Sequence, residues 1–301
     1  MDDTHLLDVL IVGAGPAGLS AGLVLGRCCR RVVMVDSNRP RQYAARRLHN
    51  FLGHAGVHPM SLRAVGRREV ESNGVVVFDG EVQRAWCEPD GHFGVSLADG
   101  RSLASRKLLL ATGVQDVLPD LPGIREFYGR GVYHCPYCDA FEHRDQSLVA
   151  FGHGEAAVGL ALSLRTWSPQ VTTCTHGQSV SAKDRQRLVR NGIELIERRL
   201  QRLEGDDMLR AVVFEDGERL ACSALFFSTG QLQRSQLPQQ LGCQIDDEQV
   251  QTGRKQRTTI PGLFLAGDAD GDVQFSIVAA AEGATAAVAI NRELQDEDRG
   301  K

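Results

Sequence analysis

The N-terminal part of the chain alternates an apolar strand, a glycine turn and an apolar helix. Residues Val9–Val12 are all apolar, Gly13–Gly18 has the sequence GAGPAG, and the spacing of apolar side chains after it predicts a helix through Leu25. A second apolar strand, Val32–Val35, ends at Asp36, roughly 20 residues after the turn. This order of strand, glycine turn, helix, strand and acid is typical of a dinucleotide-binding unit, and it leaves NAD and FAD open.

The same order of elements returns in the middle of the chain. Ser147–Phe151 predicts a strand, Gly152–Ala157 a glycine turn, and Val158–Leu164 the helix that follows. Val171–Thr175 predicts the next strand, and Ala224–Ser228 a later one. The chain therefore contains a second Rossmann-like unit.

Two further segments complete the first unit. Lys107–Gly113 predicts a buried strand that ends in a glycine turn, and Thr259–Asp268 predicts another that ends in Gly-Asp. A helix rich in small residues follows over Ile277–Ile290, and Gln295–Lys301 is interpreted as a solvated tail. We expect an α/β fold with two Rossmann-like, three-layer ββα domains of the FAD/NAD(P)-binding type, the second inserted into the first: residues 1–116 and 245–301, and residues 117–244.

Composition narrows the classes of function. The chain has 301 residues, 42% of them hydrophobic, with a formal net charge of −4. This balance is that of a soluble globular protein and predicts no nucleic-acid partner. The acidic N-terminus predicts no signal peptide, and no apolar run is long enough to span a membrane. Eight cysteines without an export signal indicate a reducing, cytoplasmic compartment.

Two of the cysteines are paired in a chemically suggestive way, in the stretch HCPYCDAFEHRD at 134–145. Cys135 and Cys138 form a CxxC motif followed by Asp139, which by itself fits a glutaredoxin, a zinc site or a redox disulfide. No second CxxC or HxxxH completes a tetrahedral zinc set, so we predict no metal. The motif also lies before the second glycine turn rather than at the start of a small domain, which disfavours the glutaredoxin interpretation.

The combination of these motifs resembles the low-molecular-weight thioredoxin reductase family. The resemblance covers nearly the whole chain, and it implies that the first glycine turn and the Gly-Asp strand bind FAD. The helix after Gln274 would then direct its positive end at the flavin. The FAD-binding residues that the resemblance implies are Gly13, Gly15, Pro16, Ala17, Gly18, Asp36, Asn50, Ala111, Thr112, Gly113, Gly267, Asp268, Gln274, Phe275 and Ser276.

The resemblance also implies roles for the CxxC motif. Cys138 would face the flavin, Cys135 would exchange with the substrate disulfide, and Asp139 would protonate the departing thiolate. That last role requires a partly buried carboxyl group with a raised pKa. The family further implies a homodimer, which no residue here shows.

The second nucleotide site departs from the family. NADPH-dependent members have His-Arg-Arg after the second glycine turn and a further arginine four residues on, and these arginines hold the 2′-phosphate. The aligned positions here are Thr175, His176, Gly177 and Ser181. His176, Lys183 and Arg185 are the residues that could compensate in part. The loss resembles ferredoxin-dependent flavin thioredoxin reductases, diflavin-linked disulfide oxidoreductases and gliotoxin-type dithiol oxidases.

We therefore predict an FAD-dependent disulfide oxidoreductase that acts on thioredoxin or another dithiol partner, without NADPH as an efficient donor. Ferredoxin is a candidate donor, and a second FAD is a candidate cofactor. The alternatives are a dithiol oxidase that passes electrons to oxygen, a conventional NADPH-dependent reductase, and an idle flavin-binding redox sensor. The basic loop formed by Arg39, Arg41, Arg46 and Arg47 is interpreted as a solvated surface, and Phe275 as a packing residue.

Overall fold

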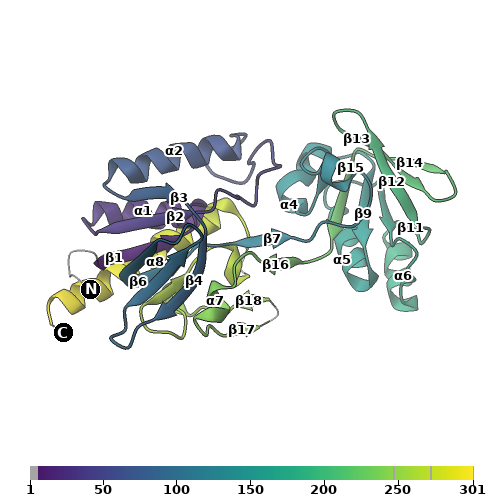
Figure 1. The fold of residues 1–301 in the computed structure, drawn as a ribbon. Coiled ribbons are helices and arrows are strands. Elements are labelled where there is room, and N and C mark those ends of the chain that lie inside the picture. Colours follow the sequence, from purple (N-terminus) through teal and green to yellow (C-terminus); the bar gives the residue numbers. More distant parts are fainter. Residues whose placement is uncertain (1–5, 247, 272, 301) are drawn as a thin grey trace. The chain divides into compact units, whose positions relative to one another are not determined.

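The computed structural model describes residues 6–246, 248–271 and 273–300. These residues divide into two compact units (Figure 1). Unit 1 consists of the described residues in the ranges 6–43, 50–115 and 232–300, and unit 2 of residues 44–49 and 116–231. The second unit is thus inserted into the first, and each is described by itself.

Unit 1 is built on a largely parallel sheet. Its strands follow the order β3-β2-β1-β6-β5-β4, and β19 pairs with Leu108–Leu110 of β6, beyond the part of β6 that pairs with β5. The contacts of β1 with β2 and β6, of β2 with β3 and of β19 with β6 are parallel, whereas β4, β5 and β6 form an antiparallel extension. The strands are Leu6–Val12 (β1), Val32–Asp36 (β2), Val76–Asp79 (β3), Val82–Cys87 (β4), Phe93–Leu97 (β5), Ser102–Leu110 (β6) and Leu263–Leu265 (β19).

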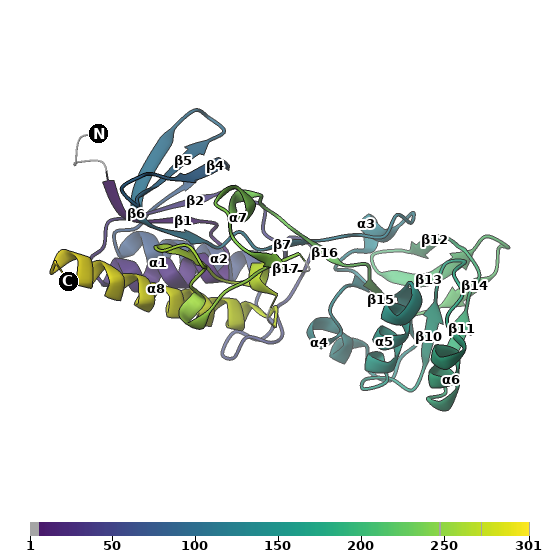
Figure 2. The ribbon, with the colours of Figure 1, turned by 90° about the horizontal axis from the view of Figure 1, so that it is seen from below.

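Helices cover one face of this sheet. Figure 2 shows α1, α2 and α8 on the same side of the strands. Val9 and Ile11 of β1 point to this face, and the neighbouring Leu10 and Val12 pack with β5 and β6 on the other, as the alternation along a strand requires. These helices are Pro16–Arg27 (α1), Pro59–Ser72 (α2) and Ser276–Asp298 (α8). The short helix Leu237–Gln240 (α7) packs with the core on the other face, and the short strands Ile245–Asp246 (β17) and Gln249–Val250 (β18) form a hairpin.

Unit 2 repeats the three-layer plan. Its parallel sheet has the strand order β11-β10-β9-β15-β8, with α5 and α6 on one face and the antiparallel sheet β12-β13-β14 on the other (Figure 1). The strands are Val132–Tyr133 (β8), Leu148–Gly152 (β9), Val171–Cys174 (β10), Glu194–Ile196 (β11), Leu200–Gly205 (β12), Leu209–Phe214 (β13), Arg219–Ala221 (β14) and Ala224–Ser228 (β15). The helices are Ile124–Phe127 (α3), Pro136–Asp139 (α4), Gly154–Leu164 (α5) and Ala182–Arg190 (α6). The predicted fold class is confirmed.

The paired strands Val114–Asp116 (β7) and Gln231–Gln233 (β16) join the units. The second crossing therefore lies near residue 232, and not at the expected boundary of 245. The physical reason is packing. Leu237 is 2% exposed and belongs to the same core as Val250 and Leu263 of unit 1, and the Gln240 side chain accepts a hydrogen bond from the Ala85 N–H at 3.0 Å.

The C-terminal segment also differs from its prediction. Helix α8 continues to Asp298, so residues 295–298 are helical, while residues 296–300 are exposed to solvent as expected; Lys301 lies outside the described residues. Ion pairs hold this end. Arg30 and Arg106 contact Asp298 at 2.7 and 2.8 Å. The predicted strand over 259–268 is regular only at Leu263–Leu265. Within the described residues, no helix combines the length and apolarity that crossing a bilayer requires.

Candidate functional site

The first glycine turn joins β1 to α1 and requires glycine at two positions. Gly13 has φ +107°, a backbone conformation that residues other than glycine rarely adopt. A Cβ at Gly13 would overlap the Ala111 carbonyl oxygen, and one at Gly18 would overlap the Gly13 carbonyl oxygen. The turn therefore packs tightly against itself and against the end of β6. Pro16 begins α1, whose N-cap Gly15 provides no side-chain hydrogen bond, so its first N–H groups stay available to an anion.

The space around this turn fits the pyrophosphate of FAD. A Cβ at Gly15 would meet no atom within 4 Å, which leaves an open cradle above the start of α1. Beside it, the buried hydroxyl of Thr112 has no hydrogen-bond partner among the described residues. Such a buried group needs a partner, and a bound phosphate or ribose would supply one. Ala111 and Gly113 flank Thr112; the Ala111 N–H bonds to the Val12 carbonyl at 2.8 Å, and Gly113 has φ +63°.

Asp36 stands at the end of β2, next to the turn. The residue is 7% exposed, and its carboxylate accepts a hydrogen bond from the Ala14 N–H at 2.9 Å. Arg63 of α2 forms an ion pair with the same carboxylate, and its Nε also donates to the Ala14 carbonyl at 3.3 Å. The acid expected to bind the ribose is thus fixed in place by a basic residue that the sequence pattern did not reveal, since Arg63 has no motif.

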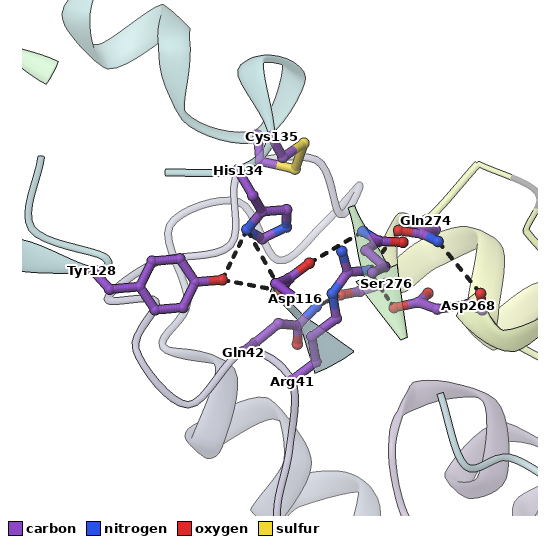
Figure 3. The surroundings of a disulfide bond; sticks show 11 residues. Arg41, Gln42, Asp116, Tyr128, His134, Cys135, Asp268, Gln274 and Ser276 are labelled. Atoms are coloured by element: carbon purple, nitrogen blue, oxygen red, sulfur yellow. Dashed lines mark hydrogen bonds and ion pairs between the residues drawn. A yellow bond between two sulfur atoms is a disulfide. The ribbon is translucent and has the colours of Figure 1, made fainter. Parts of the chain in front are cut away.

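A second set of polar side chains gathers around the Gly-Asp turn of unit 1 (Figure 3). Arg41 contacts Asp268 at 2.7 Å and the side-chain oxygen of Gln274 at 2.8 Å. The Gln42 amide donates to the Ser276 hydroxyl at 2.6 Å, at the start of α8. The Arg41 side chain is only 11% exposed, so the interpretation of this loop as a solvated surface is wrong for Arg41.

The other residues predicted around the flavin also lie in unit 1. Gly267 has φ +87°, and a Cβ there would come within 3.1 Å of the Ala17 methyl group, so small residues are needed where the Gly-Asp turn meets α1. Phe275 is the N-cap of α8 and offers no side-chain cap. Asn50 lies on the loop between β2 and α2. The set fits FAD, with the N-termini of α1 and α8 as its anion-facing ends.

The redox motif lies in unit 2, after β8. Cys135 and Cys138 are joined by a disulfide; Cys135 is the N-cap of the single turn α4, Pro136 is its first residue, and Cys138 lies within it. Asp139 follows directly and is partly buried. Burial, reinforced by the nearby Glu142 carboxylate, raises the pKa of Asp139 from 3.8 to about 7. Burial and the Asp139 charge likewise raise the pKa of Tyr133 to about 12. A carboxyl group with this pKa is half protonated near neutral pH and can donate a proton there.

The second glycine turn keeps its shape but not its phosphate clamp. Gly154 has φ +53° and is the first residue of α5; the N-cap residue His153 provides no side-chain hydrogen bond to the helix. The Nδ1 atom of His176 accepts a hydrogen bond from the Leu200 N–H at 3.0 Å, and burial, with Arg199 and His153 nearby, lowers the pKa of this imidazole. The ring is therefore engaged and mostly neutral.

The two other cations that could replace the missing arginines are Arg185, which is paired with an acid, and Lys183, which is exposed. Arg185 contacts both carboxylate oxygens of Glu197, at 2.7 and 2.8 Å, and the same carboxylate accepts from the Val180 N–H at 3.2 Å. Ser181, at the position of the further arginine, caps α6 by accepting from the Asp184 N–H at 3.1 Å. Lys183 is exposed. Glu197, directly after β11, thus places an acid beside the loop after β10, where the family resemblance implies positive charge for a 2′-phosphate.

Comparison with known proteins places this architecture. The model of the pyridine nucleotide-disulphide oxidoreductase family matches residues 7–283. The chain belongs to this family. Among curated relatives, the thioredoxin reductase aclD of Aspergillus oryzae is 29% identical over 98% of the chain and 99% of that protein.

Solved structures agree with this assignment. The crystal structure of HlmI is 37% identical with a TM-score of 0.95, covering 98% of the chain and 94% of HlmI. The atypical thioredoxin reductase TRi of Desulfovibrio vulgaris Hildenborough is 31% identical with a TM-score of 0.55, covering 97% of the chain and 99% of TRi. The chain is therefore a thioredoxin-reductase-like oxidoreductase, and its family implies FAD. In the described residues, no group of three or more His, Cys, Asp or Glu side chains is arranged to hold a metal.

Proposed function

We propose that the protein moves two electrons between FAD, the Cys135–Cys138 disulfide and a dithiol or disulfide partner such as thioredoxin, with NADPH not an efficient donor. The observation that carries the proposal is the disulfide with Asp139 beside it, whose pKa of about 7 suits proton transfer to a departing thiolate. A structural disulfide would not need an adjacent carboxyl group held half protonated.

The cysteines and Asp139 divide the chemistry between them. When bound, FAD supplies the two-electron carrier that exchanges electrons with the disulfide. In the reduced protein, Cys135 attacks the partner disulfide and forms a mixed disulfide. Cys138 then attacks Cys135, which restores the protein disulfide and releases the partner as a dithiol. Asp139 gives a proton to a thiolate as it departs and recovers it in the opposite half-reaction.

The state of the second nucleotide turn supports a donor other than NADPH. His176 accepts from the chain's own backbone, and Arg185 is paired with Glu197. An added 2′-phosphate would have to break that pair and would meet the Glu197 carboxylate. The test is anaerobic mixing of the FAD-loaded protein with micromolar NADPH while flavin absorbance is followed. We expect slow bleaching, with dithionite as the positive control; rapid bleaching by NADPH would overturn the donor clause.

A dithiol oxidase is the second candidate, and the same nucleotide turn favours it, because that reaction needs no pyridine nucleotide. Electrons would then run from a small dithiol through the Cys135–Cys138 disulfide to FAD and on to oxygen. Oxygen uptake on addition of small dithiols, unaffected by thioredoxin, would select the oxidase. Reduction of thioredoxin by the protein with chemically reduced flavin, without oxygen consumption, would select the reductase.

The proposal extends to partners that the chemistry allows. Ferredoxin is the candidate donor, and a second FAD at the unclamped nucleotide turn is the candidate cofactor. Counting FAD released from the denatured protein decides the second point: two molecules per chain support a diflavin enzyme, and one excludes it. Light scattering of the loaded protein tests the expected homodimer.

A further inference from the structure

Two side chains of opposite charge hold the backbone of Ala14, within the first glycine turn. The Ala14 N–H donates to Asp36 Oδ1 at 2.9 Å, and the Ala14 carbonyl accepts from Arg63 Nε at 3.3 Å. Arg63 and Asp36 also form an ion pair with each other. They come from different elements, since Asp36 ends β2 and Arg63 lies in α2. Together they fix the backbone of a turn whose N–H groups and helix start bind a pyrophosphate.

This ion pair is largely removed from solvent. The side chains of Arg63 and Asp36 are 14% and 10% exposed, and Ala14 is 1% exposed. The second carboxylate oxygen of Asp36 accepts from the Asn38 N–H at 3.1 Å, so both oxygens are held by backbone groups. Removing one partner of a buried pair leaves a charge without compensation, and this costs far more than the loss of a surface pair.

A second arginine–aspartate pair on the same helix provides an internal comparison. Arg67 lies four residues after Arg63, on the same side of α2, and its Nη1 atom contacts Asp79 Oδ1 at 2.7 Å. Asp79 ends β3 and is the register partner of Asp36. The Arg67 and Asp79 side chains are 25% and 60% exposed. Two arginines thus join α2 to neighbouring strand ends, and of the two it is Arg63 whose described hydrogen bonds reach the glycine turn.

When FAD is bound, the first glycine turn has to hold two negative groups close together. The pyrophosphate of FAD fits the open space at Gly15, and the Asp36 carboxylate accepts a hydrogen bond from the same turn. Negative charges at short range repel one another, and the repulsion is larger in a partly buried site than in water. The Arg63 guanidinium on Oδ2 compensates the charge of Asp36, while Oδ1 stays bonded to the turn.

We propose that Arg63 is a positioning residue for FAD. It holds Asp36 against the first glycine turn and compensates its charge, so that the acid for the ribose and the phosphates of the cofactor can occupy the same turn. Arg63 acts through Asp36 and the Ala14 backbone, and not by contact with the reacting atoms. This rests on the proposed function only in requiring that FAD bind at this turn, and electron transfer plays no part in it.

The test measures FAD binding by the full chain and not turnover. FAD-loaded protein is diluted stepwise, and the released FAD is followed by its fluorescence, which gives a Kd for each variant. We expect Arg63→Met to raise Kd at least about tenfold, because the Asp36 charge then faces the phosphates without compensation. Arg63→Lys keeps a positive charge but loses the planar arrangement of donors, so its Kd should lie between those of the wild type and Arg63→Met.

A double-mutant cycle separates a role through Asp36 from direct contact with FAD. In an Asp36→Asn background the carboxylate charge is absent, so adding Arg63→Met should change Kd by less than about twofold. An equal rise in Kd in both backgrounds would overturn the proposal, because Arg63 would then act without Asp36.

Arg67→Met is the matched control, because it removes the equivalent ion pair one helical turn further along α2. It should leave the Kd for FAD unchanged. A rise in Kd as large as that of Arg63→Met, or an unchanged Kd in Arg63→Met, would overturn the proposal. If Arg63→Met does not fold, as judged by circular dichroism, Arg63→Gln carries the same comparison, since its amide keeps a donor for the Ala14 carbonyl and has no charge. FAD release needs neither a donor nor a dithiol, so its result is independent of failure of the proposed turnover.

Discussion

Replacing Asp139 with asparagine removes an acid and keeps its size. The environment that raises the pKa from 3.8 to about 7 disfavours the ionised carboxylate by roughly 4 kcal/mol. Near pH 7 the group is therefore about half protonated, whereas an ordinary aspartate would be protonated in about one molecule in a thousand. Loss of a positioned general acid lowers a rate by about 10²- to 10⁴-fold. We expect Asp139→Asn to slow protein disulfide exchange by at least about 10²-fold at pH 6.

The assay is anaerobic stopped-flow reduction of the FAD-loaded protein by a small dithiol, with the rate divided by the concentration of dithiol thiolate. For the wild type this quotient is flat below pH 7 and falls about tenfold per pH unit above it, because the protonated form of Asp139 disappears. Asp139→Asn abolishes this break, the change of slope near pH 7. Glu142→Gln moves it to lower pH, since the Glu142 charge contributes to the raised pKa.

Stability gives an independent measure of the same pKa. The pKa of Asp139 is higher in the folded than in the unfolded protein. Protonation of Asp139 therefore contributes fully to the free energy of unfolding below about pH 4, and this contribution is lost as the pH rises to about 7. Asp139→Asn should therefore gain stability relative to the wild type between pH 4 and pH 8, by at most about 4 kcal/mol.

The control is Asp145→Asn, at an exposed position with φ +61° that asparagine tolerates. It should leave both the rate break and the stability difference unchanged. A break near pH 7 that persists in Asp139→Asn would refute the assignment of the proton to this carboxyl group.

Four further substitutions test the flavin-facing unit. Gly18→Ala should lower the melting temperature of the FAD-free protein, because its methyl group would overlap the Gly13 carbonyl. Gly15→Ala should leave that temperature unchanged and reduce the ratio of bound FAD to protein. The reverse pattern would contradict the assignment of the open space at Gly15 to FAD. Arg41→Gln should weaken FAD binding about tenfold in a fluorescence titration, because Asp268 loses its partner at 2.7 Å and repels the phosphates; an unchanged Kd would show that Arg41 is dispensable. Lys107→Met should reduce the free energy of unfolding by about 1 to 3 kcal/mol in urea denaturation, because the Lys107 ammonium group contacts Glu293 at 3.0 Å and Glu297 at 2.6 Å. An unchanged free energy of unfolding would argue against a stabilising role of these ion pairs.

Sequence by itself determined the elements whose signals are local. The strand, glycine turn and helix around Gly13 and Gly152 follow from a run of apolar residues next to glycines that a tight turn requires. The CxxC-Asp stretch is equally local, because the chemistry is carried by neighbouring residues. The missing arginines of the second turn could also be seen in the sequence, since they occupy fixed positions after a strand.

Tertiary structure alone decided which distant groups meet. Arg41 contacts Asp268, and Arg63 contacts Asp36, across separations that no periodicity links. The end of α8 stays helical because Arg30 and Arg106 bind Asp298. The raised pKa of Asp139 depends on burial, which is a property of the packed unit and not of the motif. Side-chain contacts and desolvation depend on the folded chain, so the sequence predicted the elements, and the fold supplied their partners.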